Sequence, residues 1–273
     1  MIARPPIVLC FAASDPTGGA GVQADILTVA ALGCHPLSVL TALTAQDTRG
    51  VHGVQAVQAD WVEAQARRLL EDMPVDAFKI GVLGSAANVE AVARAIEQRP
   101  RLPVVLDPVL ASGRGDALAD AATREALRTR LLPLATVLTP NSLEARHLCG
   151  DDGAPLEACA ARLVETGCRH VLVTGTHEPG AQVVNTLYGA SGRIREDHWP
   201  RLPGGYHGSG CTLASALAAF LARGLPVAEA AREAQAYTWK ALQRGFNAGA
   251  GQSLPHRFPE PVHGDPRPLR DHA

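Results

Sequence analysis

Short apolar segments alternate with helical segments along most of this chain of 273 residues. The first apolar segment, Ile7-Val8-Leu9-Cys10-Phe11, has no polar residue at alternate positions. A strand of this kind is buried on both faces, as in a parallel sheet that helices cover on both sides. The alternation therefore predicts an α/β fold whose parallel sheet has right-handed crossovers and helices on both faces.

The other predicted elements follow the same pattern. Strands are expected at 37–43, 77–80, 104–106, 136–138 and 170–173, and a hairpin at 184–196; helices are expected at 21–32, 61–73, 88–98, 120–132, 156–165, 213–223 and 227–244, with a short one that begins at Ser142. No change in composition marks a second domain, so residues 1–250 are predicted to form one domain. Residues 253–273 contain five prolines and no periodic pattern. The tail, residues 251–273, is therefore expected to be loosely ordered.

Composition argues against two classes of partner. The formal net charge is −2, there is no long basic run, and aromatic residues make up 4% of the chain, so no nucleic-acid partner is expected. No apolar stretch approaches the ~20 residues that span a bilayer, so no membrane partner is expected either. The six cysteines form no CxxC pattern. Such cysteines are typical of reduced thiols and predict a cytoplasmic protein.

The segment Tyr206-His207-Gly208-Ser209-Gly210-Cys211-Thr212 leads into a predicted buried helix. Gly208, Ser209 and Gly210 would present backbone N–H groups at the positive end of that helix, which suits an anion and above all a phosphate. Cys211 falls in the first turn, where the same groups favour a thiolate. An anion cradle beside a base is what phosphoryl transfer to an alcohol requires. The alternative is a glycine-rich loop that only leads into a buried helix.

Polar residues also follow the predicted strands at their carboxyl ends, where open α/β sheets bind ligands. A glycine-rich turn at 14–21 follows the first strand, but it has neither the dinucleotide-binding nor the P-loop spacing. Each polar residue alone also suits a turn or a helix cap, and His177 and His207 are expected to be ordinary loop residues. Convergence at one edge of the sheet favours a ligand site instead. The set comprises Asp15, Gln46, Asp107, Asn141, Glu144, Thr174 and the segment before Cys211.

Five ordered motifs carry a resemblance to a known family. They are Ala13-Ser14-Asp15-Pro16-Thr17-Gly18-Gly19-Ala20-Gly21-Val22-Gln23-Ala24-Asp25, Thr41-Ala42-Leu43-Thr44-Ala45-Gln46-Asp47-Thr48, Val105-Leu106-Asp107-Pro108-Val109, Thr139-Pro140-Asn141 with Glu144, and His207-Gly208-Ser209-Gly210-Cys211-Thr212. Over roughly residues 7–250, the chain resembles the bacterial hydroxymethylpyrimidine/phosphomethylpyrimidine kinases of thiamine biosynthesis, in the ribokinase-like superfamily.

The resemblance implies a three-layer αβα sandwich with a mostly parallel central sheet, a homodimer, and ATP with Mg²⁺. It implies phosphorylation of a small-molecule pyrimidine alcohol, 4-amino-5-hydroxymethyl-2-methylpyrimidine, and then of its monophosphate to the diphosphate. Cys211 matches the catalytic base, and Gly208, Ser209 and Gly210 match the anion hole. The resemblance also places the pyrimidine near Ala13, Ala20, Asp25, Gln46, Val82 and Val109, the nucleotide near Asn141, Glu144 and Thr174, and Mg²⁺ near Asp107 and Glu144.

The chain departs from the family pattern at three places. The common Lys-Gly-Gly-His is Thr174-Gly175-Thr176-His177, a common Met is Val82, and a common Asn-Thr is Gly205-Tyr206. Loss of the lysine removes a positive charge near the phosphates. Arg114, which is flanked by glycines, is the candidate cation that would contact the nucleotide in its place. The alternative is a solvent-exposed loop arginine.

Two other functions stay open at this stage. One is a vitamin B6 kinase of the same superfamily, since pyridoxal also carries a hydroxymethyl group on a nitrogen heteroaromatic ring. Pyridoxal kinases more often carry Asp at the position of Cys211. The other is a non-catalytic pyrimidine binder that keeps the fold, which loss of the lysine at position 174 would allow.

Overall fold

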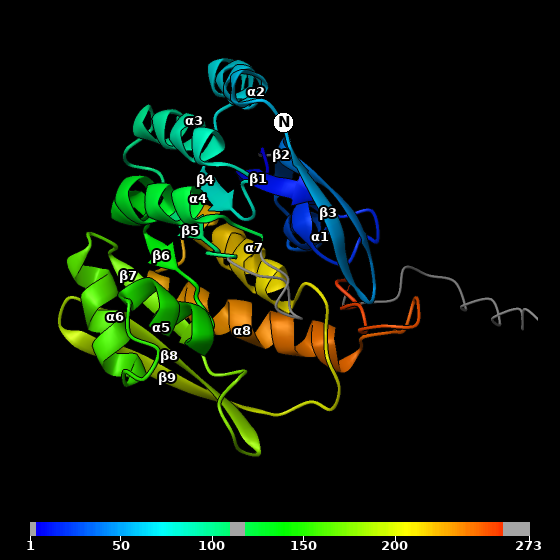
Figure 1. The fold of residues 1–273 in the computed structure, drawn as a ribbon, viewed down its shortest axis with the longest axis vertical. Coiled ribbons are helices and arrows are strands. Elements are labelled where there is room, and N and C mark those ends of the chain that lie inside the picture. The colour runs from blue at the N-terminus through cyan, green and yellow to red at the C-terminus, as the bar shows by residue number, and fades with distance from the viewer. Residues whose placement is uncertain (1–3, 110–117, 259–273) are drawn as a thin grey trace, which may run out of the picture.

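A nine-stranded sheet forms the centre of the molecule in the computed structural model, which describes residues 4–109 and 118–258 (Figure 1). The strands lie in the order β3-β2-β1-β4-β5-β6-β7-β8-β9. Neighbours from β2 to β7 are parallel, whereas β3, β8 and β9 pair antiparallel. The bounds are β1 Ile7–Ser14, β2 His35–Asp47, β3 Gly50–Ala56, β4 Ala77–Ile80, β5 Val104–Leu106, β6 Val137–Leu138, β7 His170–Thr174, β8 Gln182–Gly189 and β9 Gly192–Pro200.

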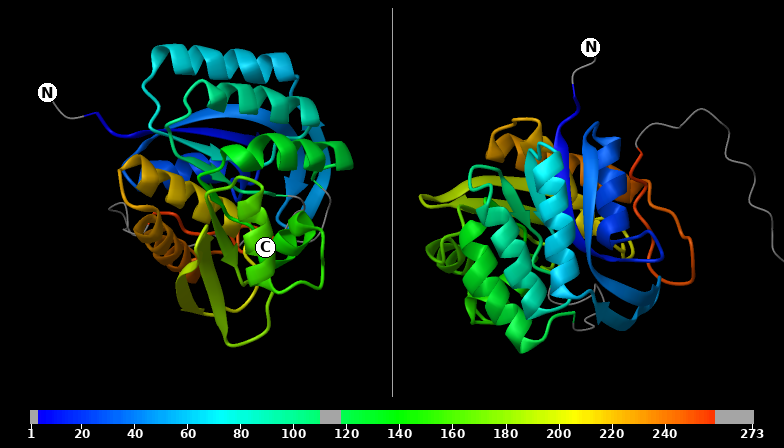
Figure 2. Two further views of the ribbon diagram at one scale, coloured as in Figure 1. Left: turned by 90° about the vertical axis from the view of Figure 1, so that its left-hand side faces the viewer. Right: turned by 90° about the horizontal axis from the view of Figure 1, so that it is seen from above.

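Helices cover both faces of the sheet (Figure 2). They are α1 Gly21–Ala31, α2 Ala59–Asp72, α3 Ala86–Glu97, α4 Ala121–Ala126, α5 Ser142–Cys149, α6 Leu156–Glu165, α7 Ser209–Ala222 and α8 Val227–Gln243. In β1, Leu9 and Phe11 pack in the cluster that contains α2, α3 and α6, whereas Val8 and Cys10 pack in the cluster that contains α1, α7 and α8. The predicted three layers and the doubly buried first strand are thereby confirmed.

The antiparallel pair β2–β3 is the main difference from the predicted strands. β2 continues to Asp47, and β3 returns along it with Thr44 opposite Val54. All residues of β3 are half-buried or exposed. The strand therefore lacks the apolar pattern by which the buried strands are predicted.

The single helix predicted at 120–132 is instead three short pieces. Asp120 caps α4 by accepting a hydrogen bond from the Thr123 amide at 2.7 Å. A π-helical turn, Leu127–Leu131, and a 3-10 turn, Leu132–Leu134, follow. Pro133 has no backbone N–H, so it cannot continue an α-helical hydrogen-bond ladder.

Part of the predicted tail packs onto the rest of the protein. Leu254 is 5% exposed and Arg257 is 4% exposed. The backbones of Phe246 and Leu254 exchange hydrogen bonds of 2.8 and 3.0 Å. Residues 253–258 therefore differ from the expected loose order, and the domain boundary at 250 stays a prediction.

Two further features concern the environment of the protein. Among the described residues, no helix is both long and apolar enough to cross a bilayer. All six cysteines are free thiols.

Candidate active site

A cavity of about 1500 Å³ lies at the carboxyl ends of the parallel strands. Typical small-molecule pockets have ~300–1000 Å³, so this one has room for two ligands. The order of the strands sets the order of the polar residues along it: Gln46 in β2, Asp15 after β1, Asp107 after β5, Asn141 after β6 and Thr174 in β7. The predicted site residues that line the cavity are Ala13, Ala20, Gln46, Val82, Asp107, Val109, Asn141, Glu144, Thr174, Gly208, Ser209, Gly210 and Cys211.

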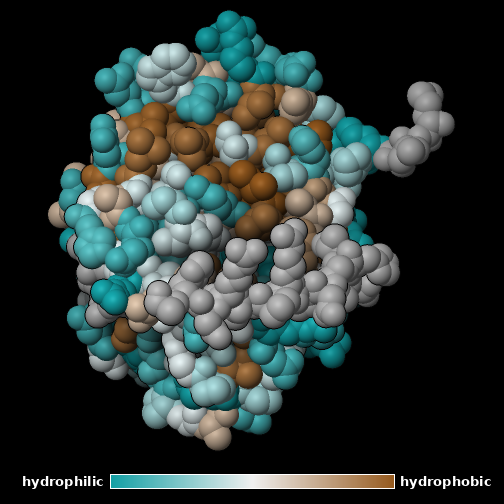
Figure 3. Space-filling model, turned by 90° about the vertical axis from the view of Figure 1, so that its right-hand side faces the viewer, coloured by the Kyte–Doolittle hydropathy of each residue, from teal (hydrophilic) through white to brown (hydrophobic). Residues whose placement is uncertain are grey.

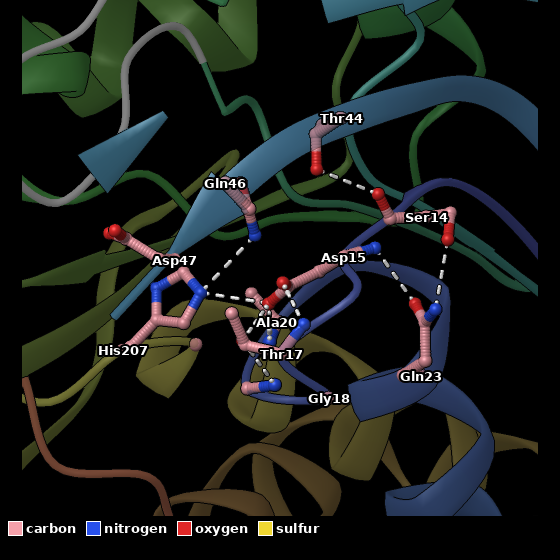
Figure 4. Close-up of polar contacts among 12 residues, drawn as sticks. Ser14, Asp15, Thr17, Gly18, Ala20, Gln23, Thr44, Gln46, Asp47 and His207 are labelled. Atoms are coloured by element: carbon pink, nitrogen blue, oxygen red, sulfur yellow. Dashed lines mark hydrogen bonds and ion pairs between the residues drawn. The ribbon is translucent and has the colours of Figure 1, made fainter. Parts of the chain in front are cut away.

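Asp15 organises the loop 15–20 at one end of the cavity (Figure 4). Its carboxylate accepts hydrogen bonds from the Thr17 amide and hydroxyl, both at 2.9 Å, and from the Ala20 amide at 2.6 Å. Burial raises the pKa of this carboxyl, but hydrogen bonds from His207, Gln46 and Thr17 outweigh burial and hold the pKa well below its usual value. Asp15 is therefore a fixed negative charge near neutral pH.

His207 belongs to this cluster, although it lies in the turn before α7 as expected of a loop residue. Its Nε2 lies 2.8 Å from Asp15 Oδ2 and 3.4 Å from Gln46 Nε2 (Figure 4). The Gln46 amide thus lies in the cavity beside the Asp15–His207 pair. An amide both donates and accepts hydrogen bonds, which suits a ring nitrogen next to an exocyclic amine.

Helix α7 begins directly at the cavity. Gly208 is its N-cap, no side chain among the described residues caps this end, and its first turn holds no acidic residue. The first N–H groups of an α-helix have no partner within the helix, so they can bind an anion. Gly208 has a φ of 77°, and a Cβ there would overlap the Gly19 carbonyl. A Cβ on Gly210 would come within 3.7 Å of the Asp107 carboxylate.

The expected low pKa of Cys211 is contradicted. Burial raises the pKa of its thiol to about 12; Lys79 lowers it, and Asp107 and Asp25 raise it. Burial of the thiol therefore outweighs the effect of the helix N-terminus, and the two carboxylates near the sulfur raise its pKa further. Burial raises the pKa of Asp107 to about 6 against the opposing effect of Lys79, so this carboxyl is mostly ionised at neutral pH.

Asp25 lies under the cavity and does not line it, in contrast to the contact with the pyrimidine that the resemblance implied. Lys79 and Asp25 are both completely buried, and Lys79 Nζ lies 2.8 Å from Asp25 Oδ1. The Ser215 hydroxyl donates to the same carboxylate at 2.7 Å. Burial lowers the pKa of Lys79, but Asp25, Cys211 and Asp107 raise it further, so the amine is charged.

Asn141 and Glu144 cap α5 in addition to lining the cavity. The Asn141 side chain accepts from the Glu144 amide at 2.9 Å, and the Glu144 carboxylate accepts from the Asn141 amide at 2.9 Å. This capping box is the structural alternative to a metal-binding role. In this box the Asn141 amide donates to Oε2 of Glu144.

The donors at this edge of the sheet fit Mg²⁺. No group of three His, Cys, Asp or Glu residues in the described ranges could hold a metal. Mg²⁺, however, commonly uses only one or two carboxylates together with substrate phosphates and water. Asp107 has a buried Oδ2 without a hydrogen-bond partner in the described structure, and both Asp107 and Glu144 line the cavity.

The turn after β7 forms the far end of the cavity. Thr174 lines it, and Arg114 lies outside the described residues. Asn185 Oδ1 accepts from the Gly175 amide at 3.1 Å, and Asn185 Nδ2 donates to Gln235 Oε1 at 3.0 Å. Trp199 Nε1 donates to the same Gln235 oxygen at 2.9 Å. These hydrogen bonds fix the turn after β7 against β8, β9 and α8.

Several residues of the site are not among those predicted from the sequence. The sequence does indicate a special role for Lys79, because a charged residue inside an apolar strand needs a buried partner of opposite charge. Asn185 and Gln235 also lie in apolar surroundings, on β8 and α8. Arg257 gives no such signal, since it lies among the prolines of the predicted tail.

Comparisons with known proteins agree with this geometry. Residues 15–256 match the phosphomethylpyrimidine kinase family. A hydroxymethylpyrimidine/phosphomethylpyrimidine kinase of Streptomyces coelicolor is 46% identical over 254 residues, which cover 90% of this chain and 92% of the relative. One of Rhizobium meliloti is 39% identical over 265 residues, which cover 92% and 97%.

Solved structures give the same result at the level of the fold. A phosphomethylpyrimidine kinase from Clostridium difficile has a TM-score of 0.76 and 32% identity, covering 86% of this chain and 99% of that one. The pyridoxal kinase from Staphylococcus aureus in complex with ADP has a TM-score of 0.86 and 28% identity, covering 95% and 96%. These likenesses confirm the ribokinase-like fold. Since the family match extends over most of the sequence and includes the cavity, the chain belongs to the phosphomethylpyrimidine kinase family.

Proposed function

We propose that this protein transfers a phosphoryl group from ATP to 4-amino-5-hydroxymethyl-2-methylpyrimidine, and then to the monophosphate, in thiamine biosynthesis. The observation that carries the proposal is the uncapped N-terminus of α7, which adjoins Cys211 and Asp107 in one cavity. The sequence relatives named above support the choice of substrate.

The acceptor binds at the β2–β1 end of the cavity. Gln46 hydrogen-bonds the polar edge of the pyrimidine, while Ala13, Ala20, Val82 and Val109 contact its ring. All of these residues line the cavity. Asp15 orients both neighbours, because its carboxylate accepts hydrogen bonds from the side chains of His207 and Gln46.

The transfer takes place at the N-terminus of α7. The N–H groups of Gly208, Ser209 and Gly210 stabilise the negative charge on the transferring phosphoryl group. Cys211 takes the proton of the attacking hydroxyl. A thiol with a pKa of about 12 holds its own proton in the empty site. The thiol donates a hydrogen bond to the Asp107 carboxylate, which is mostly ionised at neutral pH, and this contact orients the sulfur toward the site of transfer.

The nucleotide occupies the β6–β8 end, next to Asn141, Glu144 and Thr174. Arg114 stays the candidate for a further contact with its phosphates. Solved relatives contain ADP or AMP-PCP, which supports a nucleotide site. Asp107 and Glu144 would hold Mg²⁺, which supplies charge neutralisation for the phosphates when bound. Thr174 brings no positive charge to this end. Two buried cations, Lys79 and Arg257, interact electrostatically with Cys211 instead.

We further propose that the protein is a cytoplasmic homodimer. Free thiols at all six cysteines suit a reducing compartment. Figure 3 shows hydrophobic patches among hydrophilic residues on one face. Leu43 and Val54 of the β2–β3 pair are 49% and 38% exposed. Exposed apolar side chains of this size suit burial against a second copy.

Phosphorylation of a B6 vitamer is the second candidate, since the structure resembles a pyridoxal kinase at a TM-score of 0.86. A coupled assay of ADP release, run on hydroxymethylpyrimidine and on pyridoxal with Mg²⁺ and ATP, separates the candidates. We expect turnover of the pyrimidine. Turnover of pyridoxal alone would overturn the substrate assignment, and turnover of neither alcohol would leave a binding protein.

Replacing Gln46 by alanine should weaken binding of the pyrimidine by about 1–3 kcal/mol, because the ring then loses a buried hydrogen-bond partner. The KM for the pyrimidine should rise while the KM for ATP stays unchanged. Gln55→Ala is a matched control, since Gln55 is exposed on neighbouring β3. If the KM for ATP rises instead, Gln46 belongs to the nucleotide end.

A further inference from the structure

A buried arginine lies just outside the segment that matches the family. Arg257 follows directly after the matched residues 15–256 and is 4% exposed. Burying a guanidinium costs free energy unless each of its N–H groups has a hydrogen-bond acceptor. Here all three nitrogens donate hydrogen bonds to the protein.

The partners of Arg257 belong to two separate parts of the site. Nη1 donates to the Gly18 carbonyl at 3.2 Å, and Nη2 donates to the Gly19 carbonyl. Nε donates to the Thr212 hydroxyl at 3.1 Å, and that hydroxyl donates to the Gly208 carbonyl at 2.8 Å. Arg257 therefore joins the loop 15–20 to the first turn of α7.

Helix α8 anchors the arginine from the other side. The Tyr237 hydroxyl donates to the Arg257 carbonyl, and the His256 amide donates to the Ala241 carbonyl at 2.9 Å. Leu254 is buried, and a Cβ on Gly19 would collide with its side chain. The backbone that carries Arg257 is thus fixed, so its guanidinium is a rigid link.

The two parts that Arg257 joins are in direct contact. A Cβ on Gly208 would overlap the Gly19 carbonyl, so loop 15–20 and the N-cap of α7 already touch. The loop carries Asp15 and Ala20, which line the acceptor end, and α7 carries Cys211. A small relative shift would therefore change the distance between the acceptor and the site of transfer.

We propose that Arg257 is a positioning residue, which holds the acceptor loop 15–20 against the phosphoryl-binding N-terminus of α7. This inference rests on the proposed function, because it assigns the loop to the alcohol and the helix to the phosphoryl group. Misplacement by ~1 Å can cost ~10²-fold in rate. Lysine cannot replace arginine fully, because it lacks the planar fork that reaches two carbonyls and a hydroxyl together.

The test compares Arg257→Ala and Arg257→Lys with His256→Ala in the full-length protein. His256 is an exposed neighbour, so His256→Ala should behave as wild type. In folded Arg257→Ala, kcat should fall at least about tenfold and the KM for the pyrimidine should rise. ADP binding, measured by calorimetry, should change by less than about twofold, because the nucleotide end lies at other strands. Arg257→Lys should recover part of the loss.

A purely structural role would reduce the folded fraction, measured by circular dichroism, without changing the KM of the molecules that stay folded. If Arg257→Ala does not fold, Thr212→Val breaks the same link at its other end and should raise the KM for the pyrimidine in the same direction. Wild-type kinetics in folded Thr212→Val and Arg257→Lys would overturn the positioning role. Absence of pyrimidine turnover in the wild type would instead refute the proposed function.

Discussion

Replacement of Cys211 by alanine should lower kcat by roughly 10²–10⁴-fold, the usual contribution of a positioned general base. The change removes the sulfur and leaves the backbone N–H groups at the start of α7 intact. Binding of the phosphates depends on those groups, so the affinity for ADP should stay within about twofold of wild type. The measurements are single-turnover rates for the chemical step and calorimetry for ADP.

Cys168→Ala is the matched control. Burial raises the pKa of the Cys168 thiol to about 11, which resembles the environment of Cys211. Its Sγ lies 3.0 Å from the His170 carbonyl, and the residue does not line the cavity. This variant should lose stability and keep its rate per folded molecule. The opposite pattern, with a normal kcat in Cys211→Ala, would make Cys211 a packing residue.

Asp107→Asn tests whether the Asp107 carboxylate and the Cys211 thiol, which share a hydrogen bond, act together in the chemical step. If Cys211 and Asp107 act as one unit, removal of either should cost nearly as much as removal of both. The double variant should therefore lose much less than the product of the two single losses. Multiplicative losses would show that Asp107 acts independently, for example on the nucleotide.

The fold could be predicted from the sequence where a segment is buried on both sides. β1 and β5 are short apolar runs without polar alternation, and both are buried. β3 could not be predicted in this way, because it is held by pairing with β2 while its side chains are mostly exposed. The π-helical turn Leu127–Leu131 also lies in a pattern that reads as a regular helix.

The site could be predicted as far as parallel topology determines it. Asp15, Asp107 and Asn141 follow strands that share one edge, so their convergence needs only the strand directions. The pairing of Asp15 with His207, by contrast, joins residues 192 positions apart. Burial is the main reason why the pKa of Cys211 is raised, against the direction that the helix N-terminus favours; Asp107 and Asp25 add to it and reach the thiol only through tertiary packing.

The second large effect concerns stability, at the buried pair of Lys79 and Asp25. Both side chains are 0% exposed, and removal of one partner leaves the other as an uncompensated buried charge. Lys79→Met should therefore lower the free energy of unfolding by about 3–5 kcal/mol. For a chain of this size, that loss corresponds to a fall in melting temperature on the order of 10 °C. Chemical denaturation and calorimetry measure the two quantities.

The double variant Lys79→Met/Asp25→Asn makes the test specific to charge. Neutral replacement of a buried ion pair is often nearly neutral in stability, so the double variant should be more stable than Lys79→Met. Arg94→Met is the surface control: its pair with Glu63 is as short, at 2.6 Å, but about half-exposed, at 48% and 47%. It should cost less than about 1 kcal/mol, because water screens exposed pairs. A double variant no more stable than Lys79→Met would assign the loss to packing of the lysine stem, since only a charge effect can be relieved by neutralising Asp25.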